Sequence, residues 1–148
     1  MSELEDLLTQ AYYDEMESLM NYLAIGNNLE TFDGVDLGEE LLADVDEELD
    51  HAKAIAERLD VMGVHVPGSF DFAPHQEELQ PLEDHSDVVS VLKGSIKAEK
   101  EAQELYREIA ELAFEQGDHP TYQLAVEHLE DEEHHQSEME DLLVEFEH

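Results

Sequence analysis

The chain has 148 residues, of which 41 are Asp or Glu and 6 are Lys or Arg, so its formal net charge is −35. This length is typical of one domain with a sizeable core, and the charge excludes nucleic acid and anionic membrane surfaces as expected partners, because both would repel the chain. The absence of cysteine excludes disulfides, CxxC zinc sites and thiolate catalysis.

Apolar residues recur at helical spacing through most of the chain, which predicts an all-α fold. Ser2 followed by Glu5 is typical of a capping box, which predicts a first helix over about residues 3–32. Asp33, Gly34 and Gly38 then predict a short turn before a second helix over about residues 37–62.

Residues 63–86 contain several helix breakers and predict a long crossover connection. The breakers are Pro67, Gly68, Pro74 and Pro81. A third helix is expected over about residues 87–116 with Gly117 at its end, and a fourth over about residues 119–146. Short, long and short loops predict two antiparallel helix hairpins joined by one crossover, in a single four-helix-bundle domain spanning residues 1–148.

Four residues of the first half recur in the second half at one fixed offset of 84 positions. Positions i and i+3 of a helix share a face, so the glutamate and histidine of a Glu-x-x-His pair can bind one metal ion together. Two such halves supply four carboxylates and two imidazoles, the ligand set of a di-metal site in a four-helix bundle. The repeated residues are Glu15, Tyr22, Glu48 and His51, and then Glu99, Tyr106, Glu132 and His135.

The glutamates and histidines of this repeat are the predicted catalytic and metal-binding residues. Glu48 and Glu132 are expected to bridge or cap two metal ions, with Glu15 and Glu99 as terminal ligands and one histidine, His51 or His135, on each ion. For Tyr22 and Tyr106, two interpretations stay open: core packing with a satisfied hydroxyl, or a hydrogen bond to a ligand carboxylate or electron donation to the site.

Other acids and histidines receive weaker predictions. The acids that flank the ligands are expected to be mostly surface residues, with a few along an ion path. These acids are Glu47, Glu101, Asp131 and Glu133. The histidines of the crossover are His65, His75 and His85. A secondary metal or mineral site on them is the less favoured interpretation, because they lack helical registration. The pair Glu145 and His148 has no counterpart at the fixed offset and is interpreted as a chance match.

The segments DEELDHA (residues 46–52) and LEDEEHH (residues 129–135) resemble the second- and fourth-helix motifs of bacterioferritins and related ferritin-like proteins. Glu15 followed by Tyr22 resembles the first-helix pattern, and Glu99, Tyr106 and GDHPTY (residues 117–122) are similar to the third helix and its turn. The resemblance implies a ferroxidase centre on the six glutamate and histidine ligands, with two iron ions per chain and with manganese or zinc as alternative metals. It further implies that dioxygen or hydrogen peroxide oxidises Fe(II), and that ferric mineral collects in a protein shell.

The chain departs from that family in several places. Leu49 stands where bacterioferritins have a haem-binding methionine, so no haem is predicted there. Ala102 stands where rubrerythrins usually have an additional glutamate. The chain ends 13 residues after His135, which leaves no room for the fifth helix of 24-subunit ferritins. A homo-oligomer in the form of a smaller, Dps-like dodecameric cage is compatible with this, although ordinary Dps sites lie between subunits.

The remaining expectations concern the setting and the competing functions. The acidic surface favours a protein from a salt-loving host, such as a halophilic archaeon, because molar salt screens self-repulsion. Without a signal-peptide pattern or a run of membrane-spanning length, the chain is expected to be cytoplasmic. Two alternatives to the storage ferroxidase stay open: a non-storage di-metal peroxidase or oxidase of the rubrerythrin type, and a metal-free structural bundle.

Overall fold

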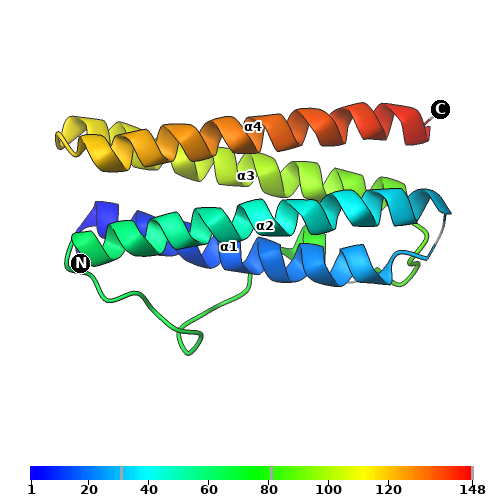
Figure 1. Cartoon of the computed structure of the whole chain (residues 1–148), viewed down its shortest axis with the longest axis horizontal. Helices are drawn as coiled ribbons and strands as arrows, with labels where there is room; N and C mark the ends of the chain where they lie inside the picture. Colours follow the sequence, from blue (N-terminus) through cyan, green and yellow to red (C-terminus); the bar gives the residue numbers. More distant parts are fainter. Residues whose placement is uncertain (31, 81, 148) are drawn as a thin grey trace.

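The computed structural model describes residues 1–30, 32–80 and 82–147, the side chains of residues 32–35 excepted. Its elements are α1 (Glu3–Asn28), α2 (Phe32–Val61), the short 3-10 helix η1 (Glu77–Leu79), α3 (Val88–Glu115) and α4 (His119–Glu147). Helix α1 packs mainly on α2 and α3 on α4, so two hairpins lie side by side (Figure 1). The predicted all-α four-helix bundle is therefore confirmed. Among the described residues, no helix is long and apolar enough to cross a membrane.

Local signals fix the helix ends. The Ser2 hydroxyl accepts a hydrogen bond from the backbone N–H of Glu5, and the Glu5 carboxylate accepts one from the backbone N–H of Ser2. This reciprocal capping box satisfies two N–H groups that the first turn of α1 leaves unpaired. At the other end of the bundle, the Asp87 carboxylate caps α3 by accepting from the backbone N–H of Ser90. Gly117, with φ +73°, terminates α3 in the left-handed conformation that glycine adopts most easily.

The turn between the first two helices lies earlier than the glycines predicted. Helix α1 ends at Asn28 and α2 already begins at Phe32, so Asp33, Gly34 and Gly38 belong to α2. Gly38 allows close helix packing instead, because a Cβ atom there would lie 2.6 Å from the backbone oxygen of Gly26 on α1. A glycine that permits close helix contact and a glycine that ends a helix give the same sequence signal, which explains the wrong prediction.

The close contact between Gly38 and Gly26 can be tested by mutation. Gly38→Ala is expected to destabilise the fold by about 1–3 kcal/mol, because the added methyl group forces α1 and α2 apart. Urea unfolding followed by circular dichroism measures the effect. Gly68→Ala is the matched control, since no atom lies within 4 Å of a Cβ built at that crossover glycine. Equal unfolding midpoints for the two variants would contradict the packing role.

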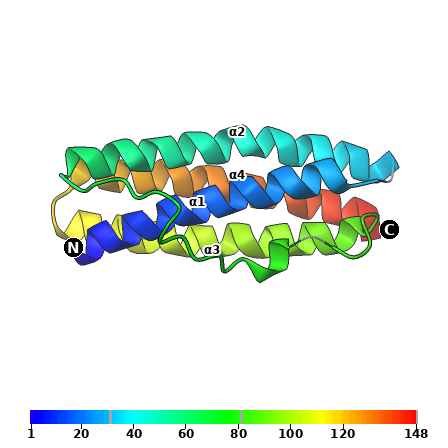
Figure 2. The same cartoon turned by 90° about the horizontal axis from the view of Figure 1, so that it is seen from below.

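The crossover runs over the face formed by α1 and α3 (Figure 2). Buried hydrogen bonds hold it there. The carboxylate of Glu17, which is 2% exposed, accepts from the backbone N–H of His75 at 3.0 Å and of Gln76 at 2.7 Å. Asn21 Nδ2 donates to Gln76 Oε1 at 3.1 Å. The middle of the crossover is thus fixed against the middle of α1. Pro81, predicted as a helix breaker, lies outside the described residues, as does His148.

Two apolar clusters fill the two ends of the bundle. One contains Ile25, Leu41 and Leu92, and the other contains Leu8 and Ile55. Between them, at mid-height of all four helices, the buried residues are acids and histidines. Burial of apolar surface at both ends contributes roughly 25 cal/mol for each Å² and holds the fold together, so the polar middle is free to carry chemistry.

Candidate metal centre

The structure brings the six predicted ligands together in the middle of the bundle. Every one of them is at most 4% exposed. Each Glu-x-x-His pair lies on one helical face and turns both side chains inward, as the i, i+3 spacing requires. Helix α1 provides Glu15, α2 provides Glu48 and His51, α3 provides Glu99, and α4 provides Glu132 and His135.

The six side chains form two groups that share two members. In the first group, oxygen or nitrogen atoms of Glu15, His51, Glu48 and Glu132 lie within 4.8 Å of one another. In the second group, atoms of Glu99 and His135 lie equally close to atoms of the same Glu48 and Glu132. This geometry offers two adjacent cation positions, each with its own glutamate and histidine, and with two carboxylates in common.

Each of the six residues also keeps one buried atom without a hydrogen-bond partner. An unpaired buried polar atom costs about 1–3 kcal/mol, so this number of them in one cluster fits a centre built for cations. Four carboxylates would balance the charge of two divalent ions, and the oxygen and nitrogen donors suit iron, manganese or zinc. The atoms are Glu15 Oε2, Glu48 Oε1, His51 Nδ1, Glu99 Oε2, Glu132 Oε1 and His135 Nδ1.

Tyr22 and Tyr106 each contact the glutamate of the opposite half. The Tyr22 hydroxyl donates to Glu99 Oε1 at 2.8 Å, and the Tyr106 hydroxyl donates to Glu15 Oε1 at 2.6 Å. Burial and nearby carboxylates raise the pKa of both tyrosines well above the usual value, so both remain protonated donors. Each hydroxyl is thus satisfied in the core and, by the same contact, orients one of the predicted ligands.

Removing one of these hydroxyl groups is expected to weaken metal binding. Tyr106→Phe leaves Glu15 without its orienting donor, and loss of such a contact typically lowers metal affinity about 10–100-fold. Competition for Co(II) against a coloured chelator measures the affinity. Tyr122→Phe is the control, because the Tyr122 side chain is 38% exposed and packs on Phe114 away from the centre. An unchanged affinity in Tyr106→Phe would exclude this orienting role.

Two further acids hold the histidine rings, and sequence reasoning missed their role. Asp131 Oδ2 lies 2.8 Å from His51 Nε2, and the Glu47 carboxylate contacts His135 Nε2. Both acids are about half exposed, at 51% and 53%, and yet each directs a buried ring so that Nδ1 faces the carboxylate cluster. Because Glu47 and Asp131 are themselves separated by the fixed offset of 84, extending the repeat by one position would have found them.

Without metal, protons take the place of cations in this centre. Burial raises the pKa of Glu48 well above its usual value, and the carboxylates of Glu132 and Glu15 raise it further. Burial alone would favour a neutral His51, but Glu132 and Glu15 raise the pKa of this histidine to about 11. The same balance, with Glu132 and Asp44 as neighbours, raises the pKa of His135 to about 10. A metal ion must therefore displace these protons as it binds.

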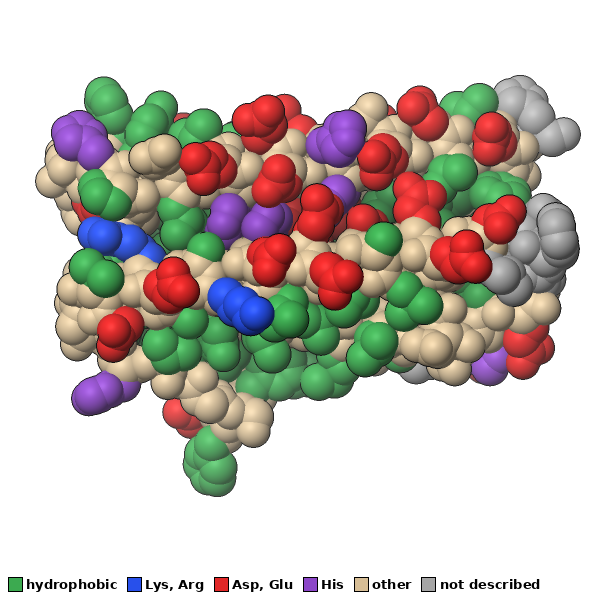
Figure 3. Space-filling view, viewed as in Figure 1, with side chains coloured by type: hydrophobic (Ala, Val, Ile, Leu, Met, Phe, Trp, Pro, Cys, Tyr) green, Lys and Arg blue, Asp and Glu red, His purple; other side chains and the backbone are tan. Residues whose placement is uncertain are grey.

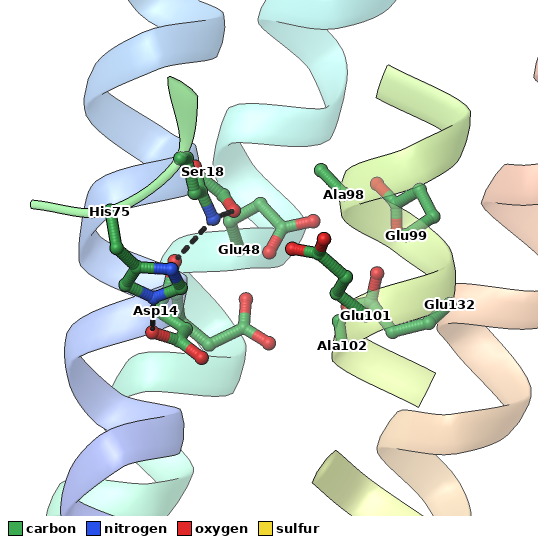
Figure 4. Close-up of a pocket in the computed structure, with 11 residues that line it drawn as sticks. Asp14, Ser18, Glu48, His75, Ala98, Glu99, Glu101, Ala102 and Glu132 are labelled. Carbon is green, nitrogen blue, oxygen red and sulfur yellow. Dashed lines mark hydrogen bonds and ion pairs between the residues drawn. The ribbon is translucent and has the colours of Figure 1, made fainter. Parts of the chain in front are cut away.

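A small cavity adjoins the centre beneath the crossover (Figure 4). Its volume is about 20 Å³, enough for one molecule the size of water. All four ligand glutamates reach its wall. On the outer side, His75 Nε2 lies 2.6 Å from Asp14 Oδ1, and Glu101 lines the wall from α3. His75 therefore lies at the cavity, a position that sequence reasoning gave to none of the crossover histidines.

Comparisons with known proteins agree with this geometry. The sequence matches the ferritin-like domain over residues 5–148. No functionally curated protein matches it. Among solved structures, a ferritin-like, diiron-carboxylate protein from Bacillus anthracis has a TM-score of 0.84 at 19% identity and covers 97% of this chain and 99% of its own. A bacterioferritin from Rhodobacter capsulatus, described with a metal-free dinuclear site and haem iron, has a TM-score of 0.84 at 20% identity and covers 99% of this chain and 87% of its own. The chain belongs to the family of ferritin-like domains.

Proposed function

We propose that the protein is a ferroxidase that binds two Fe(II) ions at the six buried ligands, oxidises them, and stores or detoxifies Fe(III) in a shell built from copies of the chain. The observation that carries this proposal is the set of unpartnered oxygen and nitrogen atoms, one on each of the six residues, in two groups that share Glu48 and Glu132. The diiron and dinuclear sites named for the two similar structures support it.

The residues have distinct roles in the proposed reaction. Glu48 and Glu132 bridge the two ions, Glu15 with His51 completes one position, and the matching pair from the second half completes the other. Carboxylates stabilise the more highly charged Fe(III) product more than Fe(II), which favours oxidation at this site. Two Fe(II) ions supply two electrons, which together with two protons reduce one dioxygen molecule to hydrogen peroxide or one hydrogen peroxide molecule to two water molecules.

The size of the cavity supports a small oxidant. A volume of about 20 Å³ is enough for one molecule the size of water, so a small oxidant fits this cavity better than an organic substrate does. This favours the ferroxidase over an oxidase of organic molecules. The rubrerythrin-like peroxidase remains the second candidate, because the same cavity admits hydrogen peroxide. The two differ in outcome, since a peroxidase turns over without accumulating iron.

Anaerobic metal-free protein mixed with Fe(II) and then with oxygen tests the proposal. Stopped-flow absorbance is expected to show a fast phase that saturates at two Fe(II) per chain, followed by slower uptake of further iron. The iron is expected to co-elute with a particle of many chains of 16.9 kDa each. A fast phase without retained iron would favour the peroxidase, and the absence of any fast phase would contradict both candidates.

His75 is expected to slow the release of metal ions from the centre. His75→Ala removes a ring that lines the cavity and contacts Asp14, so a chelator is expected to extract bound Co(II) several-fold faster. Loss of cobalt absorbance after addition of excess chelator measures the rate. The control is His65→Ala, at an exposed crossover histidine that does not contribute to the cavity wall. Equal extraction rates for the two variants would show that metal ions leave by another route.

A further inference from the structure

The two cation positions have unequal surroundings. The offset of 84 that relates the six ligands also relates Asp44 to His128, Glu40 to Leu124, and Ala54 to Glu138. In each of these pairs, only one member is acidic. The repeat thus covers the ligands, the two tyrosines and the acids that hold the histidines, whereas these three further positions around the histidines differ between the two halves.

The His135 side of the centre is rich in carboxylates. Asp44, which is 7% exposed, places Oδ1 3.8 Å from His135 Nε2. Atoms of Asp44, Glu47 and His135 lie within 4.8 Å of one another. Burial raises the pKa of Asp44, His135 lowers it, and the carboxylates of Glu47, Glu40 and Glu138 raise it, to about 7 in all. In the space-filling view, acidic side chains crowd the face between α2 and α4 around the histidines (Figure 3).

The His51 side has fewer carboxylates around its histidine. His128, which is 6% exposed, occupies the position that corresponds to Asp44 and stacks on His51 with ring centroids 4.0 Å apart. The edge of this ring packs against Tyr106 at 5.1 Å. Asp131, the counterpart of Glu47, is the acid that contacts His51 Nε2.

We propose that the two positions of the centre bind cations with unequal affinity, and that the position of Glu99 and His135 fills first. The inference rests on the proposed di-metal centre and goes beyond it. Both positions share Glu48 and Glu132, and each adds one glutamate and one histidine of its own. The difference in affinity is therefore assigned to Asp44, Glu40 and Glu138. Carboxylates beside Nε2 of His135 attract a divalent ion bound at Nδ1 of the same ring, and partly buried ones are poorly screened by salt. Their attraction is expected to favour the first-filled position roughly tenfold.

Crystals grown from protein loaded with one Co(II) per chain test the proposal at pH 8. Anomalous diffraction at the cobalt edge gives the occupancy of each position without any need for activity. The wild type is expected to show the stronger peak beside Glu99 and His135. Equal peaks, or a stronger peak beside Glu15 and His51, would overturn the inference and leave the centre intact. Cobalt at neither position would overturn the centre itself.

Variants test whether the three named acids, and not the overall negative charge of the protein, cause the unequal occupancy. Asp44→Asn combined with Glu40→Gln and Glu138→Gln is expected to bring the two peaks close to equal. The matched control changes three exposed acids of α2 and α4, Glu39→Gln, Asp46→Asn and Asp141→Asn, and is expected to keep the wild-type preference. A second variant, His128→Asp, adds a carboxylate beside His51 and is expected to strengthen the peak there. A preference that survives in the triple variant and in His128→Asp would contradict the assignment to these residues.

Discussion

Glu48→Gln is expected to slow Fe(II) oxidation by at least about a hundredfold, the scale on which loss of one preorganised electrostatic contact acts. Glu48 belongs to both cation positions, so a neutral amide there removes negative charge from both ions at once. The amide keeps the shape of the side chain, so the change tests charge and not packing. Stopped-flow absorbance after mixing with two Fe(II) per chain measures the rate. His135→Ala is expected to abolish rapid oxidation as well, through the loss of one position.

Glu48→Gln is expected to leave the metal-free fold intact or to make it more stable. Burial and the carboxylates of Glu132 and Glu15 raise the pKa of Glu48 and favour its neutral form, which the uncharged glutamine side chain reproduces. Thermal unfolding of the metal-free variant checks this. Glu133→Gln on α4 is the control, because its carboxylate is exposed and pairs with Arg107 at 3.5 Å. A rate of Fe(II) oxidation in Glu48→Gln equal to that of the wild type would contradict the assignment of Glu48 as a shared ligand.

Metal binding is expected to stabilise the fold strongly, and by more as the pH rises. A cation present at a hundred times its dissociation constant adds about 2.7 kcal/mol of stability. For a chain of this size, each 1 kcal/mol raises the melting temperature by roughly 2–4 °C. Because four carboxylates meet at the centre, removing the cation leaves them to be neutralised by protons alone.

The sign of the pH dependence follows from the raised pKa values of the metal-free protein. His51 and His135, with pKa values of about 11 and about 10, contribute stability that is fully present below the unfolded value of 6.5 and is lost as the pH rises toward 10–11. The raised pKa of Glu48 likewise contributes stability to the metal-free protein, and this stability is lost as the pH rises above the unfolded value of 4.5. Cation affinity has the opposite dependence, because protons compete less at higher pH.

The gap in melting temperature between cobalt-loaded and metal-free protein is therefore expected to widen from pH 6 to pH 8. Differential scanning calorimetry with and without Co(II) at constant salt measures it. The Glu48→Gln variant provides the comparison, since a centre that has lost a shared ligand is expected to show a much smaller gap. A gap that narrows with rising pH would mean that the buried histidines do not carry protons in the metal-free protein.

Features with a regular period were predictable from the sequence. Helical spacing and the order of short, long and short loops gave the bundle, because both are local patterns. The fixed offset brought Glu15, Glu48 and His51 into register with their counterparts on the other hairpin. The prediction of a turn at Gly38 was wrong, because a glycine in the sequence does not distinguish a turn from a close helix contact.

The surroundings of the site were harder to predict, because they depend on contacts between distant segments. Asp131 holds a histidine 80 residues away in the sequence, and Glu17 fixes the crossover through backbone groups 58 and 59 residues away. The stacking of His128 on His51 likewise joins α4 to α2. Leu49 predicts a chain without haem, and the absence of a Soret band in the purified protein would test that prediction.

The inner faces of the two similar hairpins are expected to converge on a shared pair of cations. Anomalous diffraction from a crystal soaked anaerobically in Fe(II) tests this arrangement. Two iron peaks roughly 3.5–4 Å apart are expected, with Glu48 and Glu132 in contact with both and one histidine on each. Iron bound elsewhere, or these six side chains turned away from any bound iron, would contradict it.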